Sequence, residues 1–130
     1  GLFGIHGGHV NVTDGRHVYM RAAAAPDNEP LFNYTLMPTH MRDMFPVEEL
    51  AGLELAEPFS FTKGCSPMRT RCLKPAPEIS FETMLFDLEQ DPWQHEPLDD
   101  GATEERMIEL MRGLMEQCEA PADQYERLGL

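Results

Sequence analysis

The clearest pattern in the chain is a pair of alternating segments joined by a short polar turn. In residues 9–13 and 16–21, apolar side chains occupy every second position, which is typical of strands with one buried face. The intervening Asp14-Gly15 pair is typical of a two-residue hairpin turn, in which both positions adopt positive φ angles. We therefore predict a β-hairpin with four apolar side chains on one buried face. These are Val10, Val12, Val18 and Met20.

Other segments also have the composition of strands. Residues 31–37 and 82–88 are rich in aromatic, β-branched and other strand-forming side chains, and residues 1–5 are apolar and strand-like. Residues 58–77, by contrast, contain many Gly, Pro, Ser and Thr residues. We predict that this stretch is extended and irregular.

Two segments predict helices. Pro46 followed by acidic residues favours a short helix over residues 46–51. A longer amphipathic helix is expected to begin near Thr103, as its N-cap, and to end before Pro121. Its apolar stripe comprises Met107, Met111, Leu114, Met115 and Cys118. These elements predict an α+β fold, a small antiparallel sheet of about four strands packed against a carboxy-terminal α-helix.

Composition limits the classes of partner. A chain of 130 residues fits a single domain over residues 1–130, and its 42% hydrophobic content is that of a globular protein. The net charge of −13 repels phosphate backbones, so no nucleic-acid partner is expected. No apolar run approaches the roughly 20 residues that cross a bilayer, so no membrane partner is expected either.

Two segments resemble the sulfatase family in content, order and separation. Residues 10–21, Val-Asn-Val-Thr-Asp-Gly-Arg-His-Val-Tyr-Met-Arg, resemble the hairpin that opens the family's smaller carboxy-terminal subdomain. Residues 85–92, Leu-Phe-Asp-Leu-Glu-Gln-Asp-Pro, resemble the family's Leu-Tyr-Asp-Leu-Glu-x-Asp-Pro motif, with Phe86 in place of Tyr. An acidic turn at residues 97–100 and the final helix follow in the same order, while residues 38–77 match loosely.

The resemblance implies a non-catalytic carboxy-terminal subdomain of a sulfatase-like sulfuric ester hydrolase, within the alkaline phosphatase superfamily. Its implied partners are the parent's amino-terminal catalytic domain, which it stabilises, and an anionic, sulfated substrate, whose pocket it helps to shape. Formylglycine and calcium are implied for that catalytic domain, and no cofactor is expected in this chain. The alternatives are a subdomain of a related phosphonate or phosphate monoester hydrolase, or an independent acidic interaction module.

One segment has the spacing of the family's Cys-x-Pro-x-Arg motif, whose Cys or Ser matures to formylglycine. It is Cys65-Ser66-Pro67-Met68-Arg69. It lies between the two carboxy-terminal motifs, whereas the family's nucleophile lies near the start of the catalytic domain. It also lacks a nearby pair of Asp or Asn ligands for a hard cation. We therefore expect no catalytic residue in this chain and no activity from it alone.

Two groups of side chains are candidates for contacts with an anionic substrate. Two histidines flank a Gly-Gly pair near the expected seam with the catalytic domain, and residues 58–77 contain several basic residues and no acid. Guanidinium groups suit the oxygens of sulfate. The candidates are His6, His9, Lys63, Arg69 and Arg71. Alternative interpretations are surface histidines in a strand-entry loop, and a mobile basic loop or a docking strip for the protein's own acidic body.

The remaining features have structural interpretations. The apolar residues Leu2, Phe3 and Ile5 are expected to form the face that meets the partner domain and to allow self-association of the isolated chain. The acidic residues of 87–91 are interpreted as turn caps and a solvated face. Free, mostly buried thiols are the simplest interpretation of Cys65, Cys72 and Cys118, with a Cys65–Cys72 bridge left open.

Overall fold

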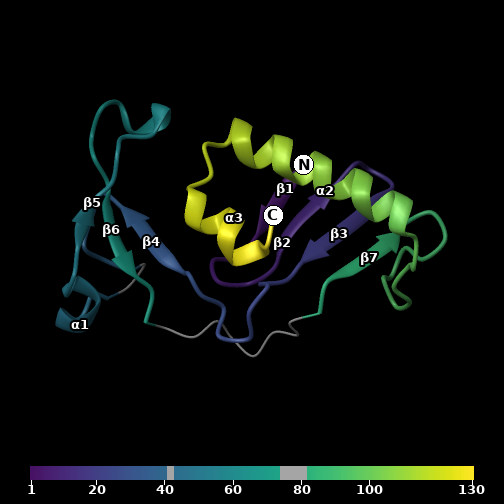
Figure 1. Ribbon diagram of the computed structural model, residues 1–130, viewed down its shortest axis with the longest axis horizontal. Helices are drawn as coiled ribbons and strands as arrows, with labels where there is room; N and C mark the ends of the chain where they lie inside the picture. The colour runs from purple at the N-terminus through teal and green to yellow at the C-terminus, as the bar shows by residue number, and fades with distance from the viewer. Residues whose placement is uncertain (41–42, 74–81) are drawn as a thin grey trace. The chain divides into compact units, whose positions relative to one another are not determined.

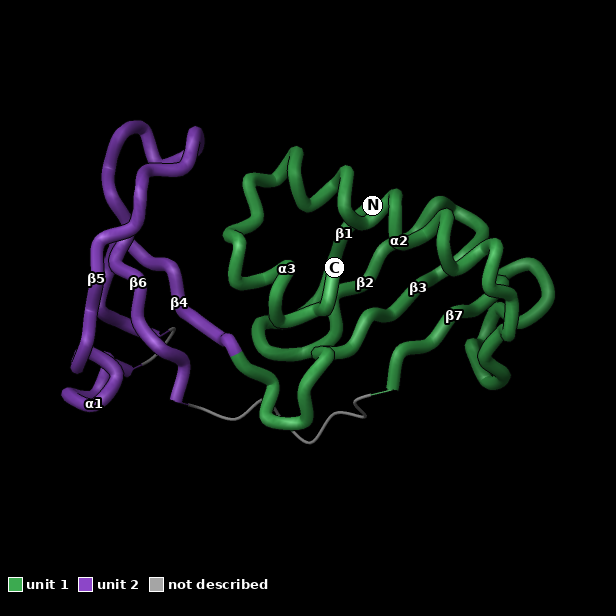
Figure 2. The backbone as a smooth tube through the Cα atoms, in the orientation of Figure 1, with its two compact units in different colours: residues 1–29, 76–130 green, residues 30–75 purple. Residues whose placement is uncertain are grey.

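The chain forms two compact units, coloured separately in Figure 2. The computed structural model describes residues 1–40, 43–73 and 82–130. Unit 1 comprises Gly1–Glu29 and Ala76–Leu130, and unit 2 comprises Pro30–Pro75. Unit 1 contains a four-stranded antiparallel sheet and carboxy-terminal helices. The predicted α+β class is therefore confirmed.

The sheet of unit 1 has the strand order β1-β2-β3-β7, and every neighbouring pair is antiparallel (Figure 1). Its strands are β1 (Leu2–Gly4), β2 (Val10–Thr13), β3 (His17–Arg21) and β7 (Met84–Asp87). The hairpin, the strand-like start and the strand within residues 82–88 are confirmed. The predicted strand at residues 31–37 exists but belongs to the sheet of unit 2, and β1 takes the fourth place in unit 1.

The hairpin register differs from the prediction. Val12 pairs with Tyr19, and Thr13 pairs with Val18. Directly opposed residues share a face of a sheet, so Tyr19, rather than Val18 or Met20, lies on the same face as Val12. The predicted four-residue apolar face is therefore wrong. Only a connection with an odd number of residues would have brought those four side chains together.

The turn itself is longer than the expected Asp14-Gly15 pair. The strand pairing leaves residues 14–17 in the connection, and Gly15, with φ of 102°, has the positive φ angle in it. Asp14 instead uses its side chain, whose Oδ1 accepts hydrogen bonds from the backbone N–H groups of Arg16 at 2.9 Å and His17 at 2.6 Å. A side-chain acceptor thus replaces the second positive φ position.

Two helices follow β7, namely α2 (Gly101–Gln117) and α3 (Ala122–Leu128). The N-cap of α2 is Asp100, and the prediction of Thr103 is wrong. The Asp100 carboxylate accepts hydrogen bonds from the first free N–H groups of α2 and also from the Thr103 hydroxyl, at 2.7 Å. Pro121 lies after the end of α2, as predicted, but it also precedes α3, which the sequence analysis missed.

Helix α2 lies across one face of this sheet (Figure 1). The buried core comprises Val12, Tyr19, Leu85, Met107, Met111, Met115 and Leu128. The methionine stripe of α2 therefore packs in the core, whereas Cys118, predicted to belong to it, is exposed. Leu2 packs against the same core, while Phe3 and Ile5 are exposed. None of the helices in the described ranges is long and apolar enough to span a membrane.

Unit 2 contains a three-stranded antiparallel sheet with the order β4-β6-β5. Its elements are β4 (Phe32–Thr35), α1 (Val47–Leu50), β5 (Glu54–Leu55), the 3-10 helix η1 (Ser60–Thr62) and β6 (Met68–Arg71). The strand within residues 31–37 and the short helix are confirmed. The prediction of an irregular stretch is wrong for residues 68–71, which form the central strand, and residues 74–77 lie outside the described residues.

Candidate functional site

The two segments that carry the sulfatase resemblance meet at ion pairs, of which the shortest joins Arg16 to Asp87. Arg16, in the hairpin turn, donates from Nη2 to Oδ2 of Asp87 at 2.6 Å and from Nε at 3.2 Å. The Asp87 carboxylate also accepts the N–H of Glu89 at 3.0 Å and the side-chain amide of Gln90 at 3.1 Å. The hydrogen bond from Arg16 is the main reason that the pKa of Asp87 falls to about 2. Asp87 therefore fixes the end of β7 to the hairpin and remains ionised.

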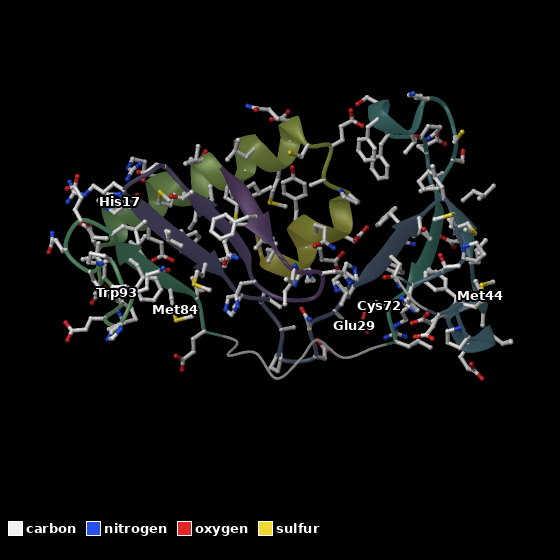
Figure 3. The ribbon with its side chains drawn as sticks, turned by 180° about the vertical axis from the view of Figure 1, so that it is seen from behind. His17, Glu29, Met44, Cys72, Met84 and Trp93 are labelled. Carbon is white, nitrogen blue, oxygen red and sulfur yellow. The ribbon has the colours of Figure 1, made fainter. Side chains whose placement is uncertain are left out.

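The second half of the 85–92 motif closes the loop that follows β7. The Asp91 carboxylate accepts the N–H of Glu96 at 2.9 Å, which is the largest cause of the lowered pKa of Asp91. The loop returns to the sheet where the N–H of Leu98 donates to the Leu85 carbonyl at 2.7 Å. Trp93, labelled in Figure 3, is 82% exposed on this loop. These contacts agree with the interpretation of the acidic residues as turn caps.

A second charged cluster connects the hairpin turn to α2. Arg106 donates from Nη1 to Oδ2 of Asp14 at 2.8 Å, and Nδ1 of His17 lies 3.2 Å from the same oxygen. Burial raises the pKa of Asp14, but hydrogen bonds from His17, Arg106 and Arg16 outweigh burial and hold that pKa well below its usual value. The carboxylates of Asp14 and Asp87 are thus both engaged as ionised acceptors, so neither is suited to proton transfer near neutral pH.

The loop between β1 and β2 holds both candidate histidines. His9 is buried, and its Nε2 lies 2.9 Å from the carbonyl oxygen of Glu82. Because a carbonyl only accepts, Nε2 donates in this contact. His6 is exposed. The interpretation of both as surface histidines is therefore wrong for His9, whose Nε2 is occupied and not available to a substrate.

Two cavities adjoin this loop. A cavity of about 450 Å³ includes Phe3, Asn11 and Met20 in its lining, which the strand pairing places on the sheet face opposite Val12. A second cavity, of about 230 Å³, brings His6 and His9 together with residues of α3. The two candidate histidines thus share one cavity.

Arg127 of α3 lines the smaller cavity, and no sequence pattern predicted it. It is 2% exposed. Its Nη1 donates to Oδ1 of Asn28 at 2.9 Å and to the carbonyl of Gly8 at 3.3 Å, and its Nε donates to Oε1 of Gln124 at 3.2 Å. Asn28, with φ of 59°, in turn donates to the carbonyl of Gly7 at 2.7 Å. An arginine in a short helix has no distinctive sequence signal, so only the packing identifies it.

The three basic candidates belong to unit 2. Arg69 lies on β6 with its guanidinium carbon 3.4 Å from the centre of the Phe32 ring. Its Nη1 donates to Glu54 at 3.1 Å, and its Nε donates to the Tyr34 hydroxyl at 3.1 Å. Arg71 lies two residues further along the strand, on the same face. Arg69 is therefore held by its own unit, which resembles the docking-strip interpretation more than a mobile loop.

Lys63 is the exposed residue that ends η1, with φ of 53°. It belongs to unit 2 with Arg69 and Arg71, whereas His6 and His9 belong to unit 1. Lys74, the remaining basic residue of 58–77, lies outside the described residues. The structure thus groups the candidates as two separate sets.

The remaining candidates for chemistry are the three cysteines and potential metal ligands. All three cysteines are thiols, but Cys65 and Cys118 are exposed and Cys72 is half-buried, so the expectation of mostly buried thiols is wrong. Cys65 lies in the turn after η1, where its N–H donates to Thr62 at 3.0 Å. Within residues 1–40, 43–73 and 82–130, no three His, Cys, Asp or Glu side chains are grouped so as to hold a metal ion.

Comparison of the chain with protein-family models, with curated proteins and with solved structures finds no match.

Proposed function

We propose that this chain is the non-catalytic carboxy-terminal subdomain of a sulfatase-like sulfuric ester hydrolase. The observation that carries the proposal is the pairing of Arg16 with Asp87. One residue comes from each of the two motifs that resemble the family, and the motifs lie far apart in the sequence. Their joining supports a shared structural origin, because two chance matches would have no reason to meet in adjacent strands, β3 and β7.

Exposed apolar side chains support a role that depends on a partner. In unit 1, Phe3 and Ile5 are 50% and 62% exposed. Unit 2 adds several more, including Leu36, Met37, Met44, Val47, Leu55 and Phe61. Such a surface favours an interaction site, and the partner in this proposal is the parent's own amino-terminal catalytic domain. The isolated chain is then expected to self-associate through the same side chains.

The chemical step belongs to that catalytic domain in this proposal. Formylglycine would supply the nucleophile there and calcium would neutralise the sulfate group, and the described residues of this chain offer no ligand set for the ion. The contribution of this chain is support and the shaping of the substrate pocket. Lys63 and Arg71, both exposed, are the residues that we propose to meet an anionic substrate, because their cationic groups attract its oxygen atoms.

The reading frame that precedes the codon of Gly1 tests the proposal. We expect it to encode a Cys-x-Pro-x-Arg or Ser-x-Pro-x-Arg segment together with Asp and Asn residues for a cation. A start codon immediately before Gly1, with no such segment, would contradict the proposal and favour an independent acidic module. Lys63→Gln with Arg71→Gln in the complete enzyme tests the substrate contact. Unchanged turnover of a sulfated substrate would contradict the proposed contact of Lys63 and Arg71 with the substrate.

A further inference from the structure

We infer that the smaller cavity, between the β1–β2 loop and α3, binds a small monoanion with an apolar body, and that Arg127 is the anion-binding residue. The inference concerns unit 1 alone and does not depend on the proposed function. It follows from three observations, which are the unbalanced charge of Arg127, its free donor nitrogen and the composition of the cavity wall.

The first observation is the charge balance around Arg127. Its guanidinium donates to neutral oxygens only, those of Gly8, Asn28 and Gln124. Among the described residues no carboxylate forms an ion pair with it. Burial lowers the pKa of Arg127 more than the longer-range attraction of Asp123 raises it. Several more exposed arginines, in contrast, contact carboxylates directly, namely Arg16, Arg69, Arg106 and Arg112.

A buried cation of this kind is incomplete without a counter-charge. Removing a guanidinium from water costs several kcal/mol, and neutral carbonyl groups recover only part of that cost. A guanidinium can donate five hydrogen bonds. Nε and Nη1 of Arg127 donate, whereas Nη2 donates to no oxygen in the part of the chain that the structure describes. Oxygen atoms of a carboxylate or sulfate group would complete this fork.

The lining and the volume of the cavity limit the size and the polarity of the remaining part of the ligand. Leu2, Ile5 and Val10 supply apolar surface, and His6, Gln124 and Arg127 supply the polar part. The volume of about 230 Å³ is smaller than the roughly 300 Å³ at which drug-sized sites begin. A single ring or a short alkyl chain with one anionic group fits both the size and the polarity. Aryl carboxylates and aryl sulfates share this chemistry.

Ligand titration of the 130-residue chain, followed by ¹H–¹⁵N NMR, tests the inference. The probes are benzoate, phenyl sulfate, inorganic sulfate and benzamide, which has the shape of benzoate without its charge. We expect benzoate or phenyl sulfate to bind with a dissociation constant of about 1 mM or tighter, and benzamide at least about tenfold more weakly. Shifts should centre on the amides of Gly7, Gly8 and Gln124. Whichever of benzoate and phenyl sulfate binds more tightly shows whether the cavity prefers a carboxylate or a sulfate group.

Two variants locate the binding. Arg127→Lys keeps the charge but removes the fork, and we expect about a tenfold loss of affinity, while Arg112→Gln, an exposed control, binds as the parent chain does. Because Arg127 also supports the loop, Ile5→Asp provides a second test, since it adds a negative charge at an exposed position of the cavity wall. Equal binding of benzamide and benzoate, unchanged binding in Ile5→Asp, or no binding by any anion would overturn the inference.

Discussion

The two units differ in how far their helices cover a face of their sheet. In unit 1, the long helix α2 covers one face of a four-stranded sheet and closes a core of seven buried apolar residues. Unit 2 has a three-stranded sheet, a four-residue helix and a three-residue 3-10 helix. Elements so short cannot cover a sheet face. Unit 1 therefore has a covered sheet face and a buried apolar core, whereas the described elements of unit 2 leave more large apolar side chains exposed.

Unit 2 differs from unit 1 in its exposed apolar side chains and in its buried polar atoms. Most of the large apolar side chains that remain exposed belong to it, namely Leu36, Met37, Met44, Val47, Leu53, Leu55, Phe61 and Leu73. It also contains three of the buried polar atoms without a partner among the described residues, on Asn33, Glu49 and Thr70, against one in unit 1, on Asn11. Buried polar atoms normally find partners, so these atoms are exceptions among the described residues.

The largest expected effect comes from the core of unit 1. Met111→Ala removes a fully buried side chain between α2 and the sheet, and we expect the free energy of unfolding to fall by about 2–5 kcal/mol. Urea unfolding followed by far-UV circular dichroism measures it. An exposed control in unit 2, Leu36→Ala, should change stability by no more than about 0.5 kcal/mol. Equal losses at the two positions would contradict the role of Met111 in a buried core.

Acid should weaken unit 1 through the carboxylates of Asp14, in the hairpin turn, and Asp87, at the end of β7. The folded-state pKa of Asp87 is about 2 and that of Asp14 is also lowered, so both groups stabilise the fold above the unfolded-state pKa of about 3.9. That stabilisation is lost as pH falls from about 4 towards about 2, because the unfolded chain then binds more protons. We expect Asp87→Asn to flatten this part of the pH profile of urea unfolding. The exposed control Asp99→Asn should leave the profile as it is.

The smallest effect on stability is expected at the surface of unit 2. Charged replacements of exposed apolar residues, such as Met37→Lys and Val47→Glu, should alter the free energy of unfolding by less than about 0.5 kcal/mol. They should nevertheless reduce binding of a hydrophobic dye and self-association, because both depend on the exposed apolar area. Dye fluorescence and sedimentation measure these properties. A large loss of stability instead would show that these side chains contribute to the packing of unit 2.

Sequence pattern predicted the elements whose cause is local. The alternation around Asp14-Gly15 and the methionine spacing of α2 are enough to place the hairpin and the core helix. Sequence pattern did not predict features of the structure that depend on contacts between residues far apart in the sequence. The face shared by Val12 and Tyr19 depends on the true length of the turn, and strand β6 escaped notice because its arginines resemble a basic loop until Arg69 packs over Phe32.

The candidate site was predictable in part for the same reason. His6 and His9 were selected for their residue type and spacing, and they do line a common cavity. Arg127 was not selected, since its importance arises from burial against Gly8 and Asn28, which are more than 90 residues away in the sequence. The basic residues of unit 2 were predicted from their charge and from the fit of guanidinium groups to sulfate oxygens, which gave no indication that Glu54 and Tyr34 hold Arg69.

Hydrolysis of an aryl sulfate by the complete translation product of the gene, measured beside residues 1–130 alone, tests the central claim most directly. We predict hydrolysis by the complete product and none by the isolated chain, because the proposed function assigns the nucleophile and the calcium ion to the amino-terminal catalytic domain. Hydrolysis by residues 1–130 alone would contradict the account and return Cys65 to consideration as the nucleophile. A complete product with no activity towards the sulfate ester would contradict it as well.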